Sequence, residues 1–279
     1  MQDAFAHCTN LVREADKDRF FSSLFAPAEK RSTLHALYAF DLETDQIALR
    51  VREAMAGEVR LQWWRDVVAG GRDEEARANP VAAALLHVLD RERLPRKPLS
   101  MLIDARAADL YADPIDSLAA LENFGRNTAG VIFWLAAQAL DAHGHEAAEE
   151  LVSHASAATG IVQALTRLPA RRARGKGALP DDLMGRHGAR AGDAEAGRRT
   201  PALDAVLADM REAARRNVEA VRTRLPRVDR MIRPAFLHVM LLPLALDRME
   251  RRGHDPFADE IEIPQWRRQW RLWRAARGL

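Results

Sequence analysis

The chain has 279 residues, of which 48% are hydrophobic and 29% are charged, and its formal net charge at pH 7 is +2. A chain of this length and composition can bury a substantial core, and we expect residues 1–279 to form one domain. The near-neutral charge gives no dominant basic field, which argues against a nucleic-acid partner. The one cysteine, Cys8, cannot form an intramolecular disulfide, and it stands in no metal-ligand spacing.

The amino-terminal residues are unlike a targeting segment. Asp3, Glu14, Asp16 and Asp18 give them an acidic character, and they have neither the basic, acid-poor composition of a transit peptide nor the apolar core of a signal peptide. No run of 18 or more apolar residues, the usual requirement for a membrane span, occurs in the sequence. We therefore expect a soluble cytoplasmic protein that touches membranes at most peripherally.

The spacing of apolar residues predicts an all-α protein. Alanine and leucine recur at helical spacing, and alternating runs of β-branched residues are absent. Pro27, Gly57, Asn79 and Pro114 mark boundaries between elements. The expected helices cover residues 3–14, 28–54, 58–69, 79–92, 98–111, 117–141, 146–167, 201–224, 229–252 and 265–276.

The segment at about 169–200 has a different composition, because it is rich in glycine and arginine. We expect a mobile loop there, with one short turn at 181–185. A long irregular segment inside a compact helical domain is uncommon, and it often serves as a functional lid.

Several stretches carry a resemblance to a known family. They are Asp18-Arg-Phe-Phe-Ser-Ser-Leu-Phe-Ala-Pro-Ala-Glu-Lys-Arg31, Leu37-Tyr-Ala-Phe40, Leu61-Gln-Trp-Trp-Arg-Asp66 and Arg174-Gly-Lys-Gly-Ala-Leu-Pro180. In order and spacing they resemble the squalene/phytoene synthase family. The resemblance implies the isoprenoid-synthase fold, a helical bundle around a central cavity, and enzymes that join two prenyl diphosphates head to head with Mg²⁺.

The first acidic motif of that family is only partly kept. Its paired aspartates fall at Asp45 and Leu49, so one carboxylate is replaced by an apolar side chain. Asp41 and Asp45 form a DxxxD string of their own, displaced by about 6 Å along the helix. Asp41 and Asp45 are therefore candidate metal ligands, although four-residue spacing of acids is also common on solvated helix faces.

The second acidic motif is reversed in charge. Its aspartates fall at Arg167 and Arg171, with Pro169 between them, where a proline should break the helix. A guanidinium cannot ligate Mg²⁺ and would repel it. We therefore expect no catalytic residue and no cofactor.

One branch of the family combines the same features. The Gly57-Glu-Val-Arg-Leu-Gln-Trp-Trp-Arg65 segment resembles the complex I assembly factors of mitochondria and their bacterial relatives, which keep the scaffold without the acidic motifs. The resemblance implies a non-catalytic assembly or scaffolding factor with complex I subunits as its clients, working at the periphery of the inner membrane. Two alternatives stay open: an active prenyl-diphosphate transferase that uses Mg²⁺ on Asp41 and Asp45, and a lipid or isoprenoid carrier.

Basic residues gather where the diphosphate would bind: Arg167, Arg171, Arg174 and Lys176. They are candidates for gripping a phosphate without metal. Pairing with acids such as Asp41, Glu43 and Asp45 is the interpretation that we favour, because opposite charges facing across a former metal site would substitute for the lost cations.

The carboxyl terminus is rich in tryptophan and arginine. Trp266, Trp270 and Trp273 fall at i, i+4 and i+7 of the expected helix at 265–276, flanked by arginines. Such a stripe could dock on an anionic membrane or on a partner subunit. More often a stripe of this kind closes the core of its own domain, which is the interpretation that we favour.

Overall fold

The computed structural model describes residues 1–51, 53–111, 114–142, 148–175 and 179–278. Over these residues the chain is helical, and no strand is present apart from an isolated parallel bridge between Ile115 and Pro180. This confirms the expected all-α class. In the same part of the chain, no helix is both long enough and apolar enough to cross a bilayer.

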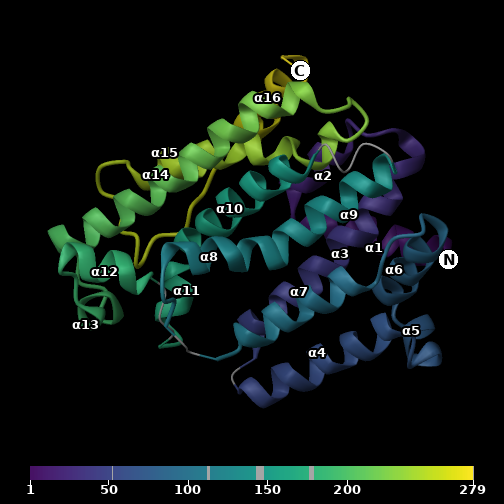
Figure 1. The fold of residues 1–279 in the computed structure, drawn as a ribbon, viewed down its shortest axis with the longest axis horizontal. Helices are drawn as coiled ribbons and strands as arrows, with labels where there is room; N and C mark the ends of the chain where they lie inside the picture. The colour runs from purple at the N-terminus through teal and green to yellow at the C-terminus, as the bar shows by residue number, and fades with distance from the viewer. Residues whose placement is uncertain (52, 112–113, 143–147, 176–178, 279) are drawn as a thin grey trace.

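The α-helices, in chain order, are α1 (Gln2–Ala15), α2 (Lys17–Ser23), α3 (Ala28–Arg50), α4 (Ala54–Ala69), α5 (Asp73–Ala78), α6 (Pro80–Arg91), α7 (Lys97–Ala108), α8 (Leu118–Gly125), α9 (Val131–Leu140), α10 (Glu149–Thr166), α11 (Leu168–Arg172), α12 (Asp181–His187), α13 (Ala191–Glu195), α14 (Pro201–Arg224), α15 (Leu242–Met249) and α16 (Gln265–Arg277) (Figure 1). A π-turn, η1 (Arg126–Gly130), joins α8 to α9. Three 3₁₀ turns, η3 (Leu225–Arg227), η4 (Arg233–Ala235) and η5 (Leu237–Leu241), separate α14 from α15.

Side-chain caps mark the starts of several helices. Asp16 caps α2 by accepting a hydrogen bond from the backbone N–H of Arg19. Asn79 accepts from two backbone N–H groups of α6, whose first residue is Pro80. Such caps satisfy donors that have no partner within the helix.

The prediction of one helix over residues 229–252 is wrong for most of that range. Only α15, at Leu242–Met249, is α-helical, and the residues before it form 3₁₀ turns. Pro234 begins no α-helix and Pro243 stands in the first turn of α15, where its missing N–H removes no internal hydrogen bond. Apolar spacing alone suggested one continuous helix.

Smaller differences concern short helices. The sequence reading missed α2 and α5, and it merged α8, η1 and α9 into one helix. Within the glycine-rich segment the structure has α11, α12 and α13, more regular structure than the single turn expected at 181–185. Residues 146–147, where we expected α10 to begin, lie outside the described part of the chain.

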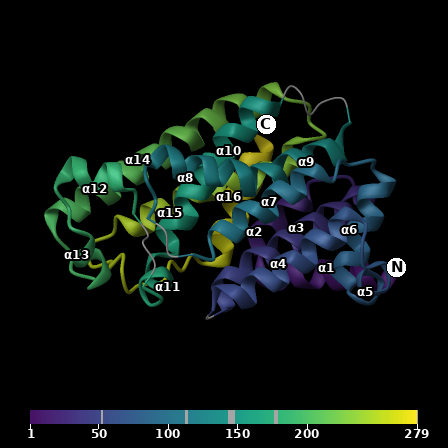
Figure 2. The ribbon, with the colours of Figure 1, turned by 60° about the horizontal axis from the view of Figure 1, so that its bottom comes forward.

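The core is built around two long helices. Helix α3 packs against α1, α4, α6 and α9 and buries Leu34, Leu37 and Phe40, while α10 packs against α8 and α14. Figures 1 and 2 show α3 enclosed by its neighbours and α10 beside α14. The polar residues of the candidate functional site come from α2, α3, α7 and the end of α10.

A close backbone contact fixes α10 against α8. A Cβ atom added to Gly125 would lie 2.6 Å from the carbonyl oxygen of Ser156, and one added to Gly160 would lie 3.0 Å from the Cα of Gly125. These distances leave no room for a side chain at Gly125. The contact therefore sets the path of α10, at whose carboxyl end Arg167 stands.

A buried histidine ties α3 to α1 and α2. The side chain of Ser23 donates to the carbonyl of Phe20 and lies 2.8 Å from Nε2 of His35, while the Thr9 hydroxyl lies 3.0 Å from Nδ1. Because the Ser23 hydrogen is already used, Nε2 carries the proton and Nδ1 accepts from Thr9. Burial, with the charge of Arg31 adding to it, lowers the pKa of His35 to about 4.

We expect this histidine to make folding pH-dependent. A lowered folded pKa means that the stabilisation is complete above the unfolded value of about 6.5 and is lost as the pH falls towards 4. Between pH 6.5 and pH 5 the loss should be about 1.5 kcal/mol for this residue. Urea denaturation at several pH values should show this slope in the natural chain and a flatter one in His35→Gln. Equal slopes in the two proteins would contradict the assignment.

Candidate functional site

The two aspartates of the DxxxD string share one buried face of α3. Asp41 is 5% exposed and Asp45 is 9% exposed. Arg106, from α7, is 2% exposed and reaches both of them. Its Nη2 donates to Oδ1 of Asp41 over 3.1 Å, and its Nη1 donates to Oδ1 of Asp45. The guanidinium therefore lies between the two carboxylates.

A second arginine reaches Asp41 from the amino-terminal side. Arg19, on α2, donates through Nη1 to Oδ2 of Asp41 over 2.7 Å and through Nε to Oδ2 of Asp16 over 2.5 Å. Its guanidinium carbon lies 5.0 Å from the ring centre of Tyr38. Both oxygens of Asp41 are thus engaged by arginines.

A third arginine reaches Asp45 from the end of α10. Arg167 donates through Nη1 to Oδ1 over 2.9 Å and through Nη2 to Oδ2 over 2.5 Å, a bidentate pair. The residues thus alternate in sign along one chain of contacts, which we call the Asp–Arg ladder: Asp16, Arg19, Asp41, Arg106, Asp45 and Arg167. The ladder has three acids and three bases, so its net charge is zero.

The ladder holds Asp45 and Arg106 in their charged forms. Burial alone would raise the pKa of Asp45, but the charges of Arg106 and Arg167 outweigh it and hold that pKa below its ordinary value. Burial alone would likewise lower the pKa of Arg106, and the charges of Asp45 and Asp41 raise it instead. Asp45 and Arg106 therefore stay charged at neutral pH because each has opposite charges beside it.

The other predicted basic residues also meet acceptors within the protein. Arg171 donates through Nη1 to Oδ1 of Asp109 over 2.8 Å, and Arg174 donates to the backbone carbonyl of Ala48 over 3.0 Å. Lys176 lies outside the described residues. Leu49 is half-buried on α3.

The geometry does not suit a magnesium ion at Asp41 and Asp45. Their carboxylate oxygens accept from guanidinium groups, and the position facing Asp45 is taken by a cation that cannot act as a ligand. Within the described residues, no group of three or more His, Cys, Asp or Glu side chains could hold a metal.

Sequence reasoning missed Arg106 and Arg19 as partners of the aspartates. A signal for Arg106 was present: it follows Leu102 and Ile103 by four and three residues, so a lone cation stands on the apolar face of α7. A buried arginine of this kind needs an acid as its partner. The sequence did not show which acid would pair with Arg106.

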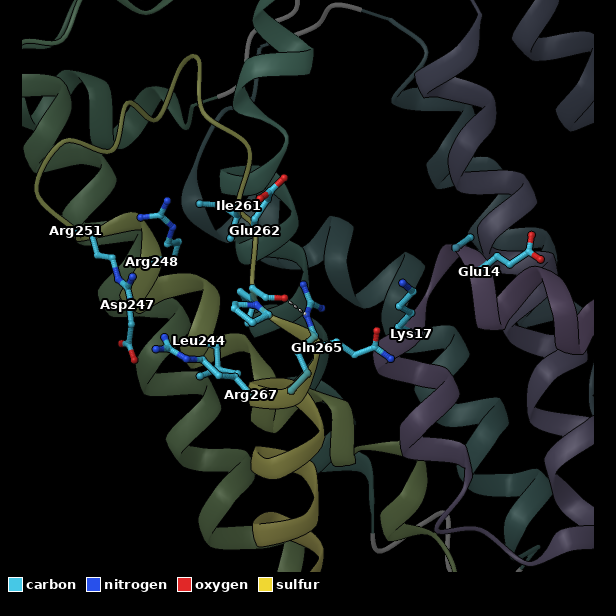
Figure 3. Close-up of a pocket in the computed structure, with 14 residues that line it drawn as sticks. Glu14, Lys17, Leu244, Asp247, Arg248, Arg251, Ile261, Glu262, Gln265 and Arg267 are labelled. Carbon is cyan, nitrogen blue, oxygen red and sulfur yellow. Dashed lines mark hydrogen bonds between the residues drawn. The ribbon is translucent and has the colours of Figure 1, made fainter.

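A depression with a different lining lies at the α1–α2 junction, where Ala15 and Lys17 flank Asp16 of the ladder (Figure 3). It has a volume of about 860 Å³ and lies between the α1–α2 junction, α15 and the start of α16. Its charged lining is mixed, with Lys17, Arg248 and Arg251 against Glu14 and Glu262. Figure 3 shows these side chains spread around the rim, so they do not converge on one ligand position.

The tryptophans of α16 lie outside the core. Trp266 is 64% exposed, Trp270 is 53% exposed and Trp273 is 47% exposed, whereas Leu272 is buried. The core-closing interpretation of the tryptophan stripe is therefore wrong. Leu272 makes that contact, packing with Leu237 and Leu241 of η5.

Comparisons of the sequence with a family model and with known proteins agree with one another. Residues 12–274 match the model of the squalene/phytoene synthase family. The chain is 29% identical to the human protein "NADH dehydrogenase (ubiquinone) complex I, assembly factor 6" over 259 residues, which cover 92% of this chain and 77% of the human one. The rat protein of the same name is 28% identical, with 96% of this chain and 84% of the rat chain covered.

Solved structures of the same fold are also similar. A dehydrosqualene synthase in complex with ligand superposes with a TM-score of 0.81 at 17% identity, covering 99% of this chain and 96% of that one. A squalene synthase from Alicyclobacillus acidocaldarius has a TM-score of 0.74 at 23% identity, with 91% and 96% covered. At these identities the likeness shows the fold alone.

Proposed function

The chain belongs to the squalene/phytoene synthase family, and on that premise we propose that it is a non-catalytic member that assists the assembly of respiratory complex I. The assembly role is supported by the relatives named as complex I assembly factor 6, which match most of this chain. Its clients would be complex I subunits. We place this work in the cytoplasm, at the periphery of the inner membrane that holds the complex.

The bidentate pair between Arg167 and Asp45 carries the non-catalytic part of the proposal. An enzyme that expels diphosphate needs divalent cations to neutralise the leaving group. Here guanidinium groups neutralise the remaining aspartates. Arg167 could bind a substrate phosphate only by leaving the buried Asp45, which would then keep Arg106 as its one paired arginine.

The same contacts argue against a prenyl diphosphate carrier. Arg167 and Arg171, which align with the diphosphate region, already donate to Asp45 and Asp109. Binding a diphosphate would require breaking both pairs, which costs more than an exposed pair because Asp45 is buried. We propose that the protein uses neither Mg²⁺ nor a prenyl ligand.

We expect the purified protein to release no pyrophosphate from farnesyl or geranylgeranyl diphosphate with Mg²⁺, and to bind neither saturably when a chelator is present. A squalene synthase assayed in parallel is the positive control. Turnover that is abolished by Asp45→Asn would overturn the non-catalytic assignment, whereas turnover indifferent to that change would come from a contaminant.

The assembly role needs a separate measurement. In cells that lack the protein, we expect the amount of assembled complex I and its NADH-oxidising activity to fall, and expression of the natural chain to restore both. Normal complex I in the depleted cells would contradict the role.

A further inference from the structure

Helix α16 has two opposite faces. Leu272 is 1% exposed, and Ala275 and Ala276 pack beside it against the rest of the protein. At 100° per residue, Trp266, Trp270 and Trp273 fall within about 60° of one another on the side away from Leu272. The three large rings are therefore held outward by the packing of the inner face.

The cations of this helix stand beside the rings. The guanidinium carbons of Arg267, Arg274 and Arg277 lie 5.2, 4.7 and 4.2 Å from the ring centres of Trp266, Trp270 and Trp273. None of the three makes an ion pair with a carboxylate in the described part of the chain. No Asp or Glu occurs between residues 263 and 279. The outer face of α16 thus combines unpaired positive charge with amphipathic rings.

The surface beside the end of α16 has the same character. Phe25 is 45% exposed, and it lines a depression of about 330 Å³ together with Arg230 and Arg277. No acid is among the residues that line this depression. The apolar and basic surface therefore extends from α16 to the turn that follows α2.

We propose that this Trp–Arg face, made of Trp266, Trp270, Trp273, Arg267, Arg274 and Arg277, docks the protein on a bilayer rich in anionic phospholipids. Tryptophan rings settle at the boundary between headgroups and acyl chains, and arginines beside them are attracted by the phosphates. A helix that presents its rings in one row along its outer side suits a flat, laterally continuous surface. The absence of acids from α16 and from the depression beside Arg277 favours an anionic surface over a mixed protein interface.

The test measures co-sedimentation of the full chain with vesicles of phosphatidylcholine alone and with vesicles that also contain 30% phosphatidylglycerol. We expect binding to the anionic vesicles, with a blue shift in tryptophan fluorescence, and weaker binding at high salt. The variant R267Q/R274Q/R277Q should bind these vesicles on the order of a hundredfold more weakly, because each cation is worth roughly a fivefold change. The variant W266Q/W270Q/W273Q should bind at least about tenfold more weakly.

Matched controls keep the result specific. M55Q/V59Q removes exposed apolar side chains from α4, where Met55 is 74% and Val59 is 67% exposed, and should bind as the natural chain does. Circular dichroism checks that every variant is folded. No vesicle binding by the natural chain, or equal binding by the Trp variant and M55Q/V59Q, would overturn the proposal, as would saturable binding of this face to a purified protein in place of vesicles. Complex I is absent from the assay, so failure here leaves the assembly role to its own test.

Discussion

Replacing Arg106 with methionine should lower the free energy of unfolding by about 3 kcal/mol, the lower end of the range of about 3–5 kcal/mol for breaking a buried ion pair. Arg106 is 2% exposed and lies between Asp41 and Asp45. Its loss leaves two carboxylates one helical turn apart with less compensating charge. Each keeps one other arginine, Arg19 or Arg167, which is why we expect the lower end. Urea denaturation at neutral pH measures the change.

The control for this variant is an exposed ion pair that also involves α7. Arg65 donates to Asp104, with side chains 33% and 63% exposed, and Arg65→Met should cost less than about 1 kcal/mol. Asp45→Asn should also be less costly when Arg106 is already methionine than in the natural chain, because the stranded charge is then removed. Additive effects of the two changes would mean that the ladder is not a coupled unit.

The helices that the sequence predicted well have both apolar spacing and clear boundary residues. Helix α14 runs over Pro201–Arg224 as expected from Pro201, and α6 follows Asn79. Helix α2 was missed because its seven residues are too few to show a periodic pattern. Its start is marked by one capping residue, Asp16. Regular apolar spacing without caps misled the prediction at 229–252.

The sequence allowed us to predict that arginines pair with acids at the candidate site, but it did not allow us to predict every pair. The sequence analysis favoured a pairing of Arg167 with an acid of α3, and the structure has that pair at Asp45. Arg171 instead pairs with Asp109, the residue that follows α7, which is 62 residues away in the sequence. Such pairings depend on how α7 and α10 are placed against α3, and sequence periodicity carries no information on that placement.

The tryptophan stripe shows a related limit. The spacing of Trp266, Trp270 and Trp273 predicts that they share a helix face, which is correct. It does not say which face turns inward, because Leu272, Ala275 and Ala276 form a second, smaller apolar face. Small residues permit closer packing against η5 than three indole rings would, so the larger rings remain outside.

The second large effect should come from Gly125→Val, which we expect to lower the free energy of unfolding by about 3 kcal/mol or more. A Cβ at this position would lie 2.6 Å from the carbonyl oxygen of Ser156. The obstacle is backbone of α10, so no side chain can move aside to relieve it. The helices must separate, and α10 would carry Arg167 away from Asp45.

A control substitution at a glycine in another helix distinguishes the steric clash at Gly125 from the general effect of replacing a glycine. Gly185, in α12, has nothing within 4 Å of an added Cβ, so Gly185→Ala should stabilise the protein by about 0.5–1 kcal/mol through helix propensity. Thermal and urea denaturation of both variants give the comparison. If Gly125→Val unfolds with the stability of the natural chain, α8 and α10 are not in backbone contact, and the position of Arg167 at the ladder must be set by something else.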